Sequence, residues 1–388
     1  MKITKFELKN ALDNNEFVFF YQPQVCFVTG KLKGAEALIR WMKSDGGLIM
    51  PNDFISLAEE NGFLNNITLN MLDILANDSK KFLAINDKLN ISINISVKSL
   101  YCSKILNKIE RLITSGSLRS ENFSIEITES TLFEYNSLNS DALNLFDYHK
   151  IQLVMDDFGT GFSNLCSLNG TPFSKIKFDY SLIKDVGKND KSTAIIIENI
   201  KMAHKLQLET VAEGVENDET YRILKDNGCS LAQGFLISKA VCRDDFISDF
   251  IRADHTFPHS PLGLVKLAKY SYIEWVENVI DFSIKKIRTP RTMESSDLLL
   301  NSNCGFLGNW KDDNIANYID EKMYYSLNKA YMESYAIAKE LIITNVENIT
   351  ISIERHLILT NKLIRKESLI LSILLLLENM LKLTHKCN

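Results

Sequence analysis

The run LVMDDFGTG at residues 153–161 decides how the first part of this chain is expected to fold. A short apolar stretch ends in two adjacent aspartates, Asp156 and Asp157, and a glycine-containing turn follows at once. Short apolar runs bounded by turn residues are typical of buried strands, and polar residues at the carboxyl end of a strand indicate a functional site there. The run therefore predicts a strand that delivers two carboxylates to one edge of a sheet.

Seven further runs of this kind surround the first one. The eight predicted strands are 17–21, 32–39, 91–95, 123–127, 152–155, 175–178, 210–212 and 231–234. Amphipathic stretches lie between them, for example at 51–61 and 192–206. Eight strands that alternate with helices within about 250 residues predict a (β/α)8 barrel of the TIM type, an α/β fold. A doubly wound sheet produces a similar pattern and is the alternative.

Glycine and proline divide the chain into two parts. Thirteen of the 16 glycines precede residue 255, and residues 309–388 contain neither glycine nor proline. Because these residues punctuate local structure, we expect a turn-rich barrel at 1–254, a linker at 255–261 and an all-α helical bundle at 262–388. Near the C-terminus two apolar sets at helical spacing predict burial on two sides, in a bundle or at a dimer seam. The first set is Leu359, Leu363, Ile370, Ile373, Leu377 and Leu381, and the second is Leu357, Ile364, Leu371, Leu374 and Leu375.

Composition excludes several classes of protein. The 388 residues are 45% hydrophobic and carry 44 basic and 49 acidic side chains, which gives a net charge of −5. The apolar fraction and the small net charge exclude a disordered chain. The lack of a basic excess argues against a protein that coats DNA. Seven scattered cysteines without a CxxC pair predict a reducing, cytoplasmic location. The most apolar run, 369–377, has nine residues, whereas a membrane span needs about 20, so we expect no transmembrane segment. A membrane-surface helix is the alternative for this run.

Polar residues follow or interrupt most of the predicted strands. They are Glu36, Asn94, Glu126, Glu129, Asp156, Asp157, Lys177, Asp179, Glu213, Glu216 and Gln233. Each taken singly is compatible with a helix cap or a solvated turn. Together, five or more carboxylates at one barrel mouth would repel one another unless cations bind between them. Carboxylate and amide oxygens without histidine favour Mg²⁺ or Mn²⁺ over zinc.

The adjacent aspartates predict two ions that share a bridging carboxylate, the arrangement used for phosphoryl displacement. Lys177 could then neutralise developing charge or hold the attacking water. The residues alone therefore predict a two-metal phosphoesterase.

Nine motifs in order carry a family resemblance. They are YQPQ (21–24), GAEALIRW (34–41), PNDFISLAEENG (51–62), INIS (93–96), EITES (126–130), DDFGTGFSNL (156–165), KIKFD (175–179), AEGVE (212–216) and AQGF (232–235). Together they resemble the EAL domain, a bacterial cyclic di-GMP-specific phosphodiesterase, over about residues 1–252. Phe178 and Ala240 depart from the residues usual in that family, and neither change removes a metal ligand or a charge.

The resemblance implies a modified (β/α)8 barrel with one reversed strand, which hydrolyses cyclic di-GMP to linear pGpG with two Mg²⁺ or Mn²⁺ ions per active site. It implies one ion held by Glu36, Asn94, Glu126 and Asp156, and a second held by Asp156, Asp157 and Glu213. It assigns Lys177 to the nucleophilic water and Glu129 to anchoring the DFGTG loop. The implied substrate-binding residues are Gln22, Leu38, Arg40, Asp179 and Gln233, the last of which would also help position waters at the metal site.

Some relatives of this kind bind cyclic di-GMP without hydrolysing it, so a catalytically weak receptor that signals through protein contacts is the alternative function. Because every ligand position is filled in this chain, an active enzyme is favoured. We expect the bundle to regulate or dimerise the enzyme, with a homodimer and a signalling protein as its partners. A pure protein-interaction module is the third and least favoured alternative.

The helical part resembles a second family, the chemoreceptor zinc-binding (CZB) domain. The stretches LAKYSYIEWVENV (267–279), CGFLGNW (304–310) and YMESYAIAKELI (331–342) carry this resemblance. Cys304 stands in its expected place, but the three positions of the family's histidine ligands hold Tyr272, Tyr331 and Tyr335. Because tyrosine has a pKa of about 10 and is mostly protonated at neutral pH, we expect no zinc bound in the family manner. Plain core aromatics of an unrelated bundle are the alternative.

Overall fold

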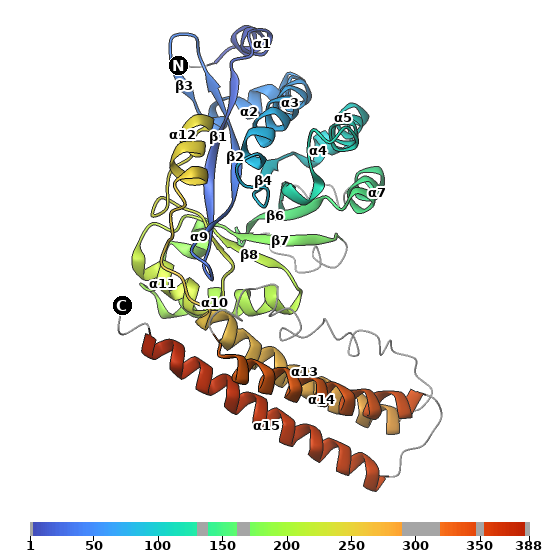
Figure 1. Ribbon diagram of the computed structural model, residues 1–388. Helices are drawn as coiled ribbons and strands as arrows, with labels where there is room; N and C mark the ends of the chain where they lie inside the picture. The colour runs from blue at the N-terminus through green and yellow to red at the C-terminus, as the bar shows by residue number, and fades with distance from the viewer. Residues whose placement is uncertain (1–2, 130–138, 161–170, 289–318, 347–352, 385–388) are drawn as a thin grey trace. The chain divides into compact units, whose positions relative to one another are not determined.

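Eight strands close into a barrel, as the sequence predicts (Figure 1). β1 pairs antiparallel with both β2 and β9, and the remaining neighbours around the ring pair in parallel. The ring consists of β1 (Phe17–Cys26), β2 (Leu32–Met42), β4 (Asn90–Asn94), β5 (Phe123–Thr128), β6 (Gln152–Phe158), β7 (Phe173–Phe178), β8 (Glu209–Ala212) and β9 (Leu231–Ala232). The alternative of an open doubly wound sheet is therefore wrong, and β1 is the reversed strand.

The computed structural model describes residues 3–129, 139–160, 171–288, 319–346 and 353–384. The chain divides into two compact units, Met1–Leu224 with Cys229–Pro258, and Lys225–Gly228 with His259–Asn388. The first unit contains the barrel and the second contains three long helices. None of the described helices combines the length and the apolar character that a bilayer span requires.

Helices of the barrel unit follow most strands, and two short strands extend its sheet. The helices are α1 (Lys5–Asp13), α2 (Pro51–Glu60), α3 (Leu64–Leu83), α4 (Val97–Leu100), α5 (Ser103–Thr114), α7 (Ser140–His149), α9 (Tyr180–Ile183), α10 (Asp190–Lys205), α11 (Asp218–Asp226) and α12 (Arg243–Phe246), with a 3-10 turn at Ser120–Asn122 and a π-helical turn at Ile247–Arg252. β3 (Leu48–Ile49) pairs with β2, and β10 (Val241–Cys242) pairs with β1. Local sequence explains α10, where the Asn189 side chain caps the first turn and Ile196, Ile200 and Ala203 form a buried stripe.

The interior of the barrel is polar, which is what positions the site. In β4 the apolar residues Ile91 and Ile93 alternate with Asn90, Ser92 and Asn94, so the two kinds of side chain lie on opposite faces. β2 and β4 approach closely at Gly34, where a Cβ atom would lie 2.3 Å from the Asn90 carbonyl oxygen. Any side chain at Gly34 would therefore push the two strands apart.

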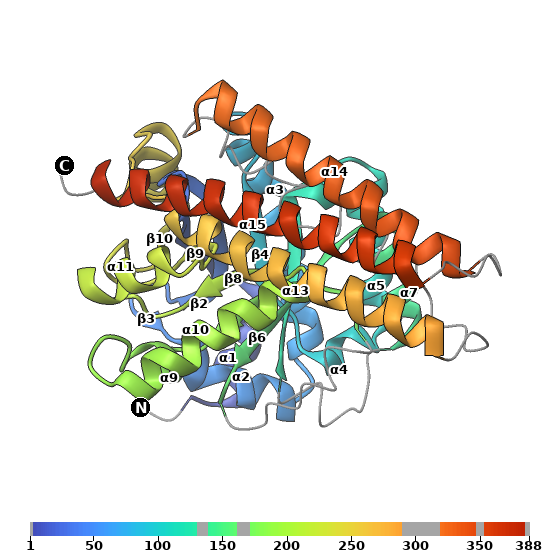
Figure 2. The ribbon, with the colours of Figure 1, turned by 90° about the horizontal axis from the view of Figure 1, so that it is seen from below.

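The second unit consists of α13 (Leu262–Arg288), α14 (Glu321–Val346) and α15 (Ile353–Thr384), which pack against one another (Figure 1, Figure 2). The first apolar set on α15 is buried, with Leu363, Ile370 and Leu377 fully enclosed. In the second set Leu357 is 55%, Ile364 42% and Leu375 48% exposed within one chain, whereas Leu374 is fully buried. The bundle of the single chain therefore buries the first set and only part of the second, and burial of the remainder at a dimer seam stays a prediction.

Candidate active site

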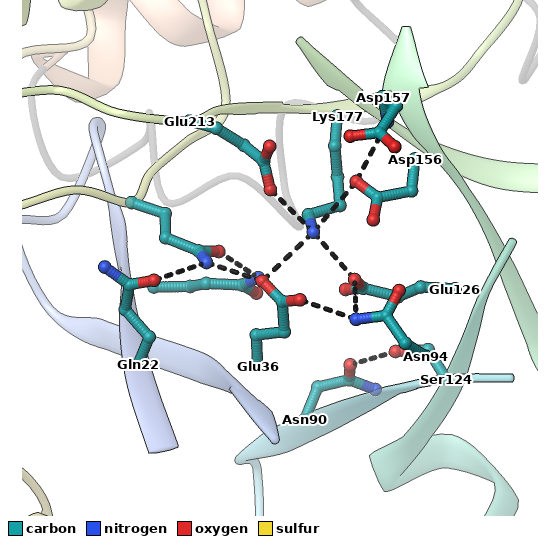
Figure 3. A network of polar contacts seen from close by, with 12 residues as sticks. Gln22, Glu36, Asn90, Asn94, Ser124, Glu126, Asp156, Asp157, Lys177 and Glu213 are labelled. Carbon is teal, nitrogen blue, oxygen red and sulfur yellow. Dashed lines mark hydrogen bonds and ion pairs between the residues drawn. The ribbon is translucent and has the colours of Figure 1, made fainter. Parts of the chain in front are cut away.

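Strand register brings the predicted polar residues together inside the barrel. Gln22 on β1 lies opposite Glu36 on β2, and Asn94 on β4 lies opposite Glu126 on β5. Residues in register on neighbouring strands share a face of the sheet, so these side chains point into the barrel side by side (Figure 3). Asn94, Glu126 and Asp156 stand at or near the ends of their strands.

Glu36 lies in the middle of β2 rather than at its end, because β2 runs on beyond the barrel. Its parallel pairing with β4 covers only Gly34 to Ala37, whereas its antiparallel pairing with β1 extends to Trp41. Glu36 therefore still marks the mouth of the parallel barrel.

Lys177 on β7 is the centre of the cluster (Figure 3). Its side chain is 1% exposed, and its Nζ atom lies 3.0 Å from Glu36 Oε2, 2.7 Å from Glu126 Oε2, 3.0 Å from Asp156 Oδ1 and 2.6 Å from Glu213 Oε1. The four carboxylates come from β2, β5, β6 and the residue that follows β8. One ammonium group thus links four separate segments of the barrel.

Neutral amides fix the orientation of Glu36. Asn94 Nδ2 donates to Glu36 Oε1 at 2.7 Å, and Gln233 Nε2 donates to Glu36 Oε2 at 2.6 Å. Gln233 is itself held, because it accepts a hydrogen bond from Gln24 Nε2 at 2.8 Å and donates to Gln22 Oε1 at 3.1 Å. Both Glu36 oxygens therefore have a fixed partner besides the lysine.

The aspartate pair depends on an irregular strand. Adjacent residues in a regular strand point to opposite faces, yet Asp156 and Asp157 both reach the cluster. The β6–β7 register shifts between Met155 and Phe158, and Asp157 has a left-handed backbone with φ of 58°. Aspartate tolerates this conformation better than most residues, and such irregularities are common beside active sites.

The charges of the cluster do not balance, and the pKa values show it. Burial, together with repulsion from Glu36 and Asp156, raises the pKa of Glu126 well above its usual range. Burial, with repulsion from Asp156 and Glu36, raises the pKa of Glu213 to about 8. Glu36 is the exception: burial opposes its ionisation, but Lys177 and the hydrogen bonds from Gln233 and Asn94 lower its pKa. One ammonium cannot neutralise all these carboxylates, so the site favours additional cations.

The donor set fits hard divalent cations. Glu36, Glu126 and Asp156 each offer an oxygen within 4.8 Å of the others, and so do Asp156, Asp157 and Glu213. Asp156 belongs to both groups. Carboxylate oxygens are the ligands that Mg²⁺ and Mn²⁺ prefer, and a shared carboxylate is typical of paired-metal sites.

We expect the metal-free protein to lose stability as the pH rises from about 6.5 to about 8. A carboxylate with a raised folded-state pKa binds its proton more tightly when folded, so ionisation of Glu213, whose pKa is raised to about 8, favours unfolding in this range. His204 has the opposite effect on stability. Because burial lowers its pKa to about 4, its contribution to stability rises with pH, but this rise is complete near pH 6.5, the ordinary pKa of histidine.

Melting temperatures measured in EDTA check this expectation, and Glu213→Gln should flatten the pH dependence. Mg²⁺ should restore more stability at pH 8 than at pH 6.5, because metal binding releases the protons. A native melting temperature that rises with pH over this interval would contradict the assignment.

The predicted substrate-binding residues lie along β2 and near the cluster. Leu38 and Arg40 fall two and four residues after Glu36, hence on the same face of β2. Arg40 is 8% exposed, donates to the Ile39 carbonyl oxygen at 2.8 Å and lies over the Phe20 ring. Asp179 caps α9 by accepting a hydrogen bond from the Ser181 amide at 2.8 Å. Its side chain thus has a structural partner already.

Glu129 lies one residue beyond β5 and is 1% exposed. The loop that it was predicted to anchor is only partly described, since Gly161 lies outside the described residues. Within the described part, Gly159 has φ of 101° and a Cβ atom there would collide with Leu182 at 2.2 Å. Glycine is therefore required at this point of the DFGTG loop.

Tyrosines of the second unit pack in the bundle core. Tyr272 and Tyr331 are 4% and 5% exposed, and their ring centroids are 6.4 Å apart. The Tyr272 hydroxyl donates to Ser334 Oγ at 2.7 Å. Tyr335 is partly buried, and Cys304 lies outside the described residues. Two of these tyrosines therefore lie close together in the bundle core, and the CZB resemblance stays a prediction.

Two polar features escaped the sequence analysis. Gln24 supports Gln233, and its only signal in the sequence is the alternation of Gln22 and Gln24 in YQPQ. Below the cluster, Ser124 Oγ donates to Asn90 Oδ1 at 2.8 Å (Figure 3). Among the described residues, Ser92 Oγ and Asn90 Nδ2 are buried and have no hydrogen-bond partner.

We expect an ordered water to hydrogen-bond to Ser92 Oγ or Asn90 Nδ2. Buried polar groups in native proteins are nearly always paired, with protein atoms or with bound water, because an unpaired one costs about 1–3 kcal/mol. A high-resolution crystal structure checks this expectation. If the site proves dry, Ser92→Ala should raise the melting temperature, whereas loss of a water-bridged hydroxyl should lower it.

Comparisons with known proteins agree with the barrel fold. The family described as "EAL domain" matches residues 6–240. Cyclic di-GMP phosphodiesterase PdeR of Escherichia coli (strain K12) is 34% identical over 236 residues, which are 60% of this chain and 35% of PdeR. The cAMP- and cyclic-di-GMP-bound form of EAL enzyme Bd1971 is 30% identical with a TM-score of 0.58, over 63% of this chain and 67% of that one. The PaMucR phosphodiesterase in its c-di-GMP complex is 29% identical with a TM-score of 0.57, over 62% and 98% of the two chains.

Several of the curated relatives are longer proteins. The chain covers about a third of the length of four of them, namely 28%, 30%, 33% and 35%.

Proposed function

This chain belongs to the EAL domain family, and on that basis we propose that its barrel hydrolyses cyclic di-GMP to linear pGpG. The observation that carries the proposal is the buried cluster in which Lys177 contacts four carboxylates and Asp156 belongs to both candidate metal-binding groups. Two similar proteins, the cyclic di-GMP phosphodiesterase PdeR and the PaMucR phosphodiesterase in its c-di-GMP complex, support the same substrate.

In the proposed mechanism, Glu36, Asn94, Glu126 and Asp156 would hold one divalent ion, and Asp156, Asp157 and Glu213 would hold the other. When bound, Mg²⁺ or Mn²⁺ would polarise the phosphodiester and lower the pKa of the attacking water. Lys177 Nζ donates a hydrogen bond to that water and so orients it. Gln233 and Asn94 keep Glu36 in one orientation through the contacts described above, and Glu129 anchors the DFGTG loop.

We assign the dinucleotide to the inner face of the β1–β2 pair. Gln22, Leu38 and Arg40 lie on this face next to Glu36. Arginine suits a phosphate because its planar guanidinium can donate two hydrogen bonds at once. Asp179 would contribute through the oxygen that does not cap α9, since the Ser181 amide occupies the other.

The test of the activity is incubation of the full chain with cyclic di-GMP and Mg²⁺ or Mn²⁺, followed by chromatography of the products. Formation of linear pGpG, abolished by EDTA and restored by excess metal, is the expected result. Binding of the dinucleotide without any product would instead favour the receptor function.

We propose that the three-helix unit regulates or dimerises the enzyme and remains a degenerate CZB-like bundle without zinc. The exposed apolar residues Leu357, Ile364 and Leu375 on α15 support a homodimer, and a signalling protein is the other proposed partner. We also propose that the enzyme is cytoplasmic, and the scattered cysteines are the only support for this location.

A chain truncated after Pro258 should lose the dimer and change in specific activity. Pro258 is a better end point than Asp254, where the barrel is predicted to end. The Tyr221 hydroxyl donates to the Pro258 carbonyl oxygen at 2.8 Å, and the Phe257 amide donates to the Gly30 carbonyl oxygen at 2.9 Å. Light scattering gives the oligomeric state, and metal analysis of the full chain gives its zinc content. Equal mass per particle and equal activity of the two chains, after allowing for chain length, would contradict the regulatory role.

A further inference from the structure

Lys177 makes more contacts than the orientation of a water requires. Its Nζ atom lies 2.6–3.0 Å from one oxygen of each of four carboxylates. Of the five carboxylates that form the two candidate metal groups, only Asp157 lacks this contact among the ion pairs of the described residues. The ammonium group is therefore placed among the oxygens that divalent ions would use.

An ammonium group and divalent ions compete for these oxygens. Mg²⁺ draws its oxygen ligands to about 2.0–2.1 Å and requires near-octahedral geometry, so it reorients the carboxylates around itself. Two like charges brought within about 4 Å in a buried site repel strongly, because little solvent screens them. The Lys177 side chain is 1% exposed, which makes that repulsion unavoidable while its nitrogen stays in contact with all four groups.

We propose that Lys177 is an internal counterion that divalent metals displace, so that metal binding exchanges one ammonium group for the ions. This inference rests on the proposed function only in assigning the metals to these carboxylates. Before exchange, Lys177 joins β2, β5, β6 and the segment after β8 and offsets part of their repulsion. After exchange, the flexible four-carbon stem lets Nζ withdraw to the edge of the site, from which it can donate to a water.

The chain supplies a matched control in the same strand. Lys175 lies two residues earlier on β7, is 6% exposed and faces the same interior, but it pairs with Glu209 at 3.1 Å. Both lysines are therefore buried and ion-paired, and only Lys177 contacts the candidate metal ligands. Methionine replaces either lysine with an unbranched, uncharged side chain of similar length.

The experiment is calorimetric titration of the full chain with Mg²⁺ at about pH 8.5, where the carboxylates of the site hold fewer protons than at neutral pH. Lys177→Met should tighten Mg²⁺ binding by about tenfold or more, because it removes a like charge from the site. In EDTA it should lower the melting temperature by about 5–15 °C, since it leaves buried carboxylates without their cation. Lys175→Met should lower the melting temperature and leave the Mg²⁺ affinity unchanged.

Unchanged or weaker Mg²⁺ binding by Lys177→Met would overturn the proposal. If that variant does not fold, crystals of the native protein with and without Mn²⁺ decide the question. Nζ should lose contact with at least two of Glu36, Glu126 and Asp156 when Mn²⁺ binds, and retention of all its contacts would refute the exchange. These measurements contain no dinucleotide, so a protein that fails to hydrolyse cyclic di-GMP would disprove the proposed function without affecting them.

Discussion

Glu36→Gln should lower kcat/KM for cyclic di-GMP by about a thousandfold or more. Glutamine keeps the size of the side chain and one oxygen, but it removes the charge that a divalent ion and Lys177 both require. Glu36 is also the carboxylate of the cluster whose pKa is lowered, by Lys177 and by hydrogen bonds from Gln233 and Asn94 against the effect of burial. It therefore carries its charge at neutral pH, and the substitution removes a full negative charge.

Steady-state hydrolysis at saturating Mg²⁺ measures the effect, with Glu209→Gln as the control. Glu209 also pairs with a buried lysine, Lys175, but it lies outside the cluster. We expect the control to lose stability while it retains hydrolysis. Native-like hydrolysis by Glu36→Gln would show that the chemistry takes place without this carboxylate.

The same variant distinguishes the enzyme from the receptor. Gln22, Leu38 and Arg40, the proposed dinucleotide contacts, are unchanged in Glu36→Gln. Equilibrium binding of cyclic di-GMP to the variant should therefore stay measurable while hydrolysis is lost. If the native protein binds the dinucleotide but releases no product even with Mn²⁺, the chain is a receptor and not an enzyme.

Strand positions and the alternation of side chains along them were predictable because both are local properties. The period-two pattern of Asn90, Ser92 and Asn94 places these residues on one face whatever the tertiary fold. The motif KIKFD offers two lysines on the same face. Lys177 is the one predicted for the site, but the spacing of the two lysines alone does not show which one meets the carboxylates. That choice depends on how the register between strands divides the interior into layers, with Lys175 opposite Glu209 and Lys177 near Glu213.

Other features depend on contacts between distant segments. Asp157 reaches the cluster because the β6–β7 register shifts and its backbone turns left-handed, and neither property is visible in the letters DD. Both apolar sets of α15 recur at helical spacings, so periodicity does not tell which of their residues face α13 and α14. Packing leaves Leu357, Ile364 and Leu375 outside.

Asp156→Asn should remove both metals, and Asp157→Asn only one. Asp156 belongs to both groups of converging carboxylates, whereas Asp157 belongs to one and is half-buried. Asparagine at 156 can still accept the hydrogen bond that the Asp157 amide donates to Oδ1 at 3.0 Å, so the local turn should persist. Asp156→Asn should then reduce hydrolysis by about a thousandfold or more, and Asp157→Asn by less.

Metal content per chain after equilibrium dialysis against Mn²⁺ separates this explanation from a loss of fold. The expected contents are two ions for the native protein, one for Asp157→Asn and fewer than one for Asp156→Asn, with similar circular dichroism for all three. Equal metal loss in both variants would mean that the ions bind only as a pair, because each then needs the charge of the other's ligands. Full metal content in Asp156→Asn would show that the two ions do not share Asp156, and it would contradict the two-metal mechanism.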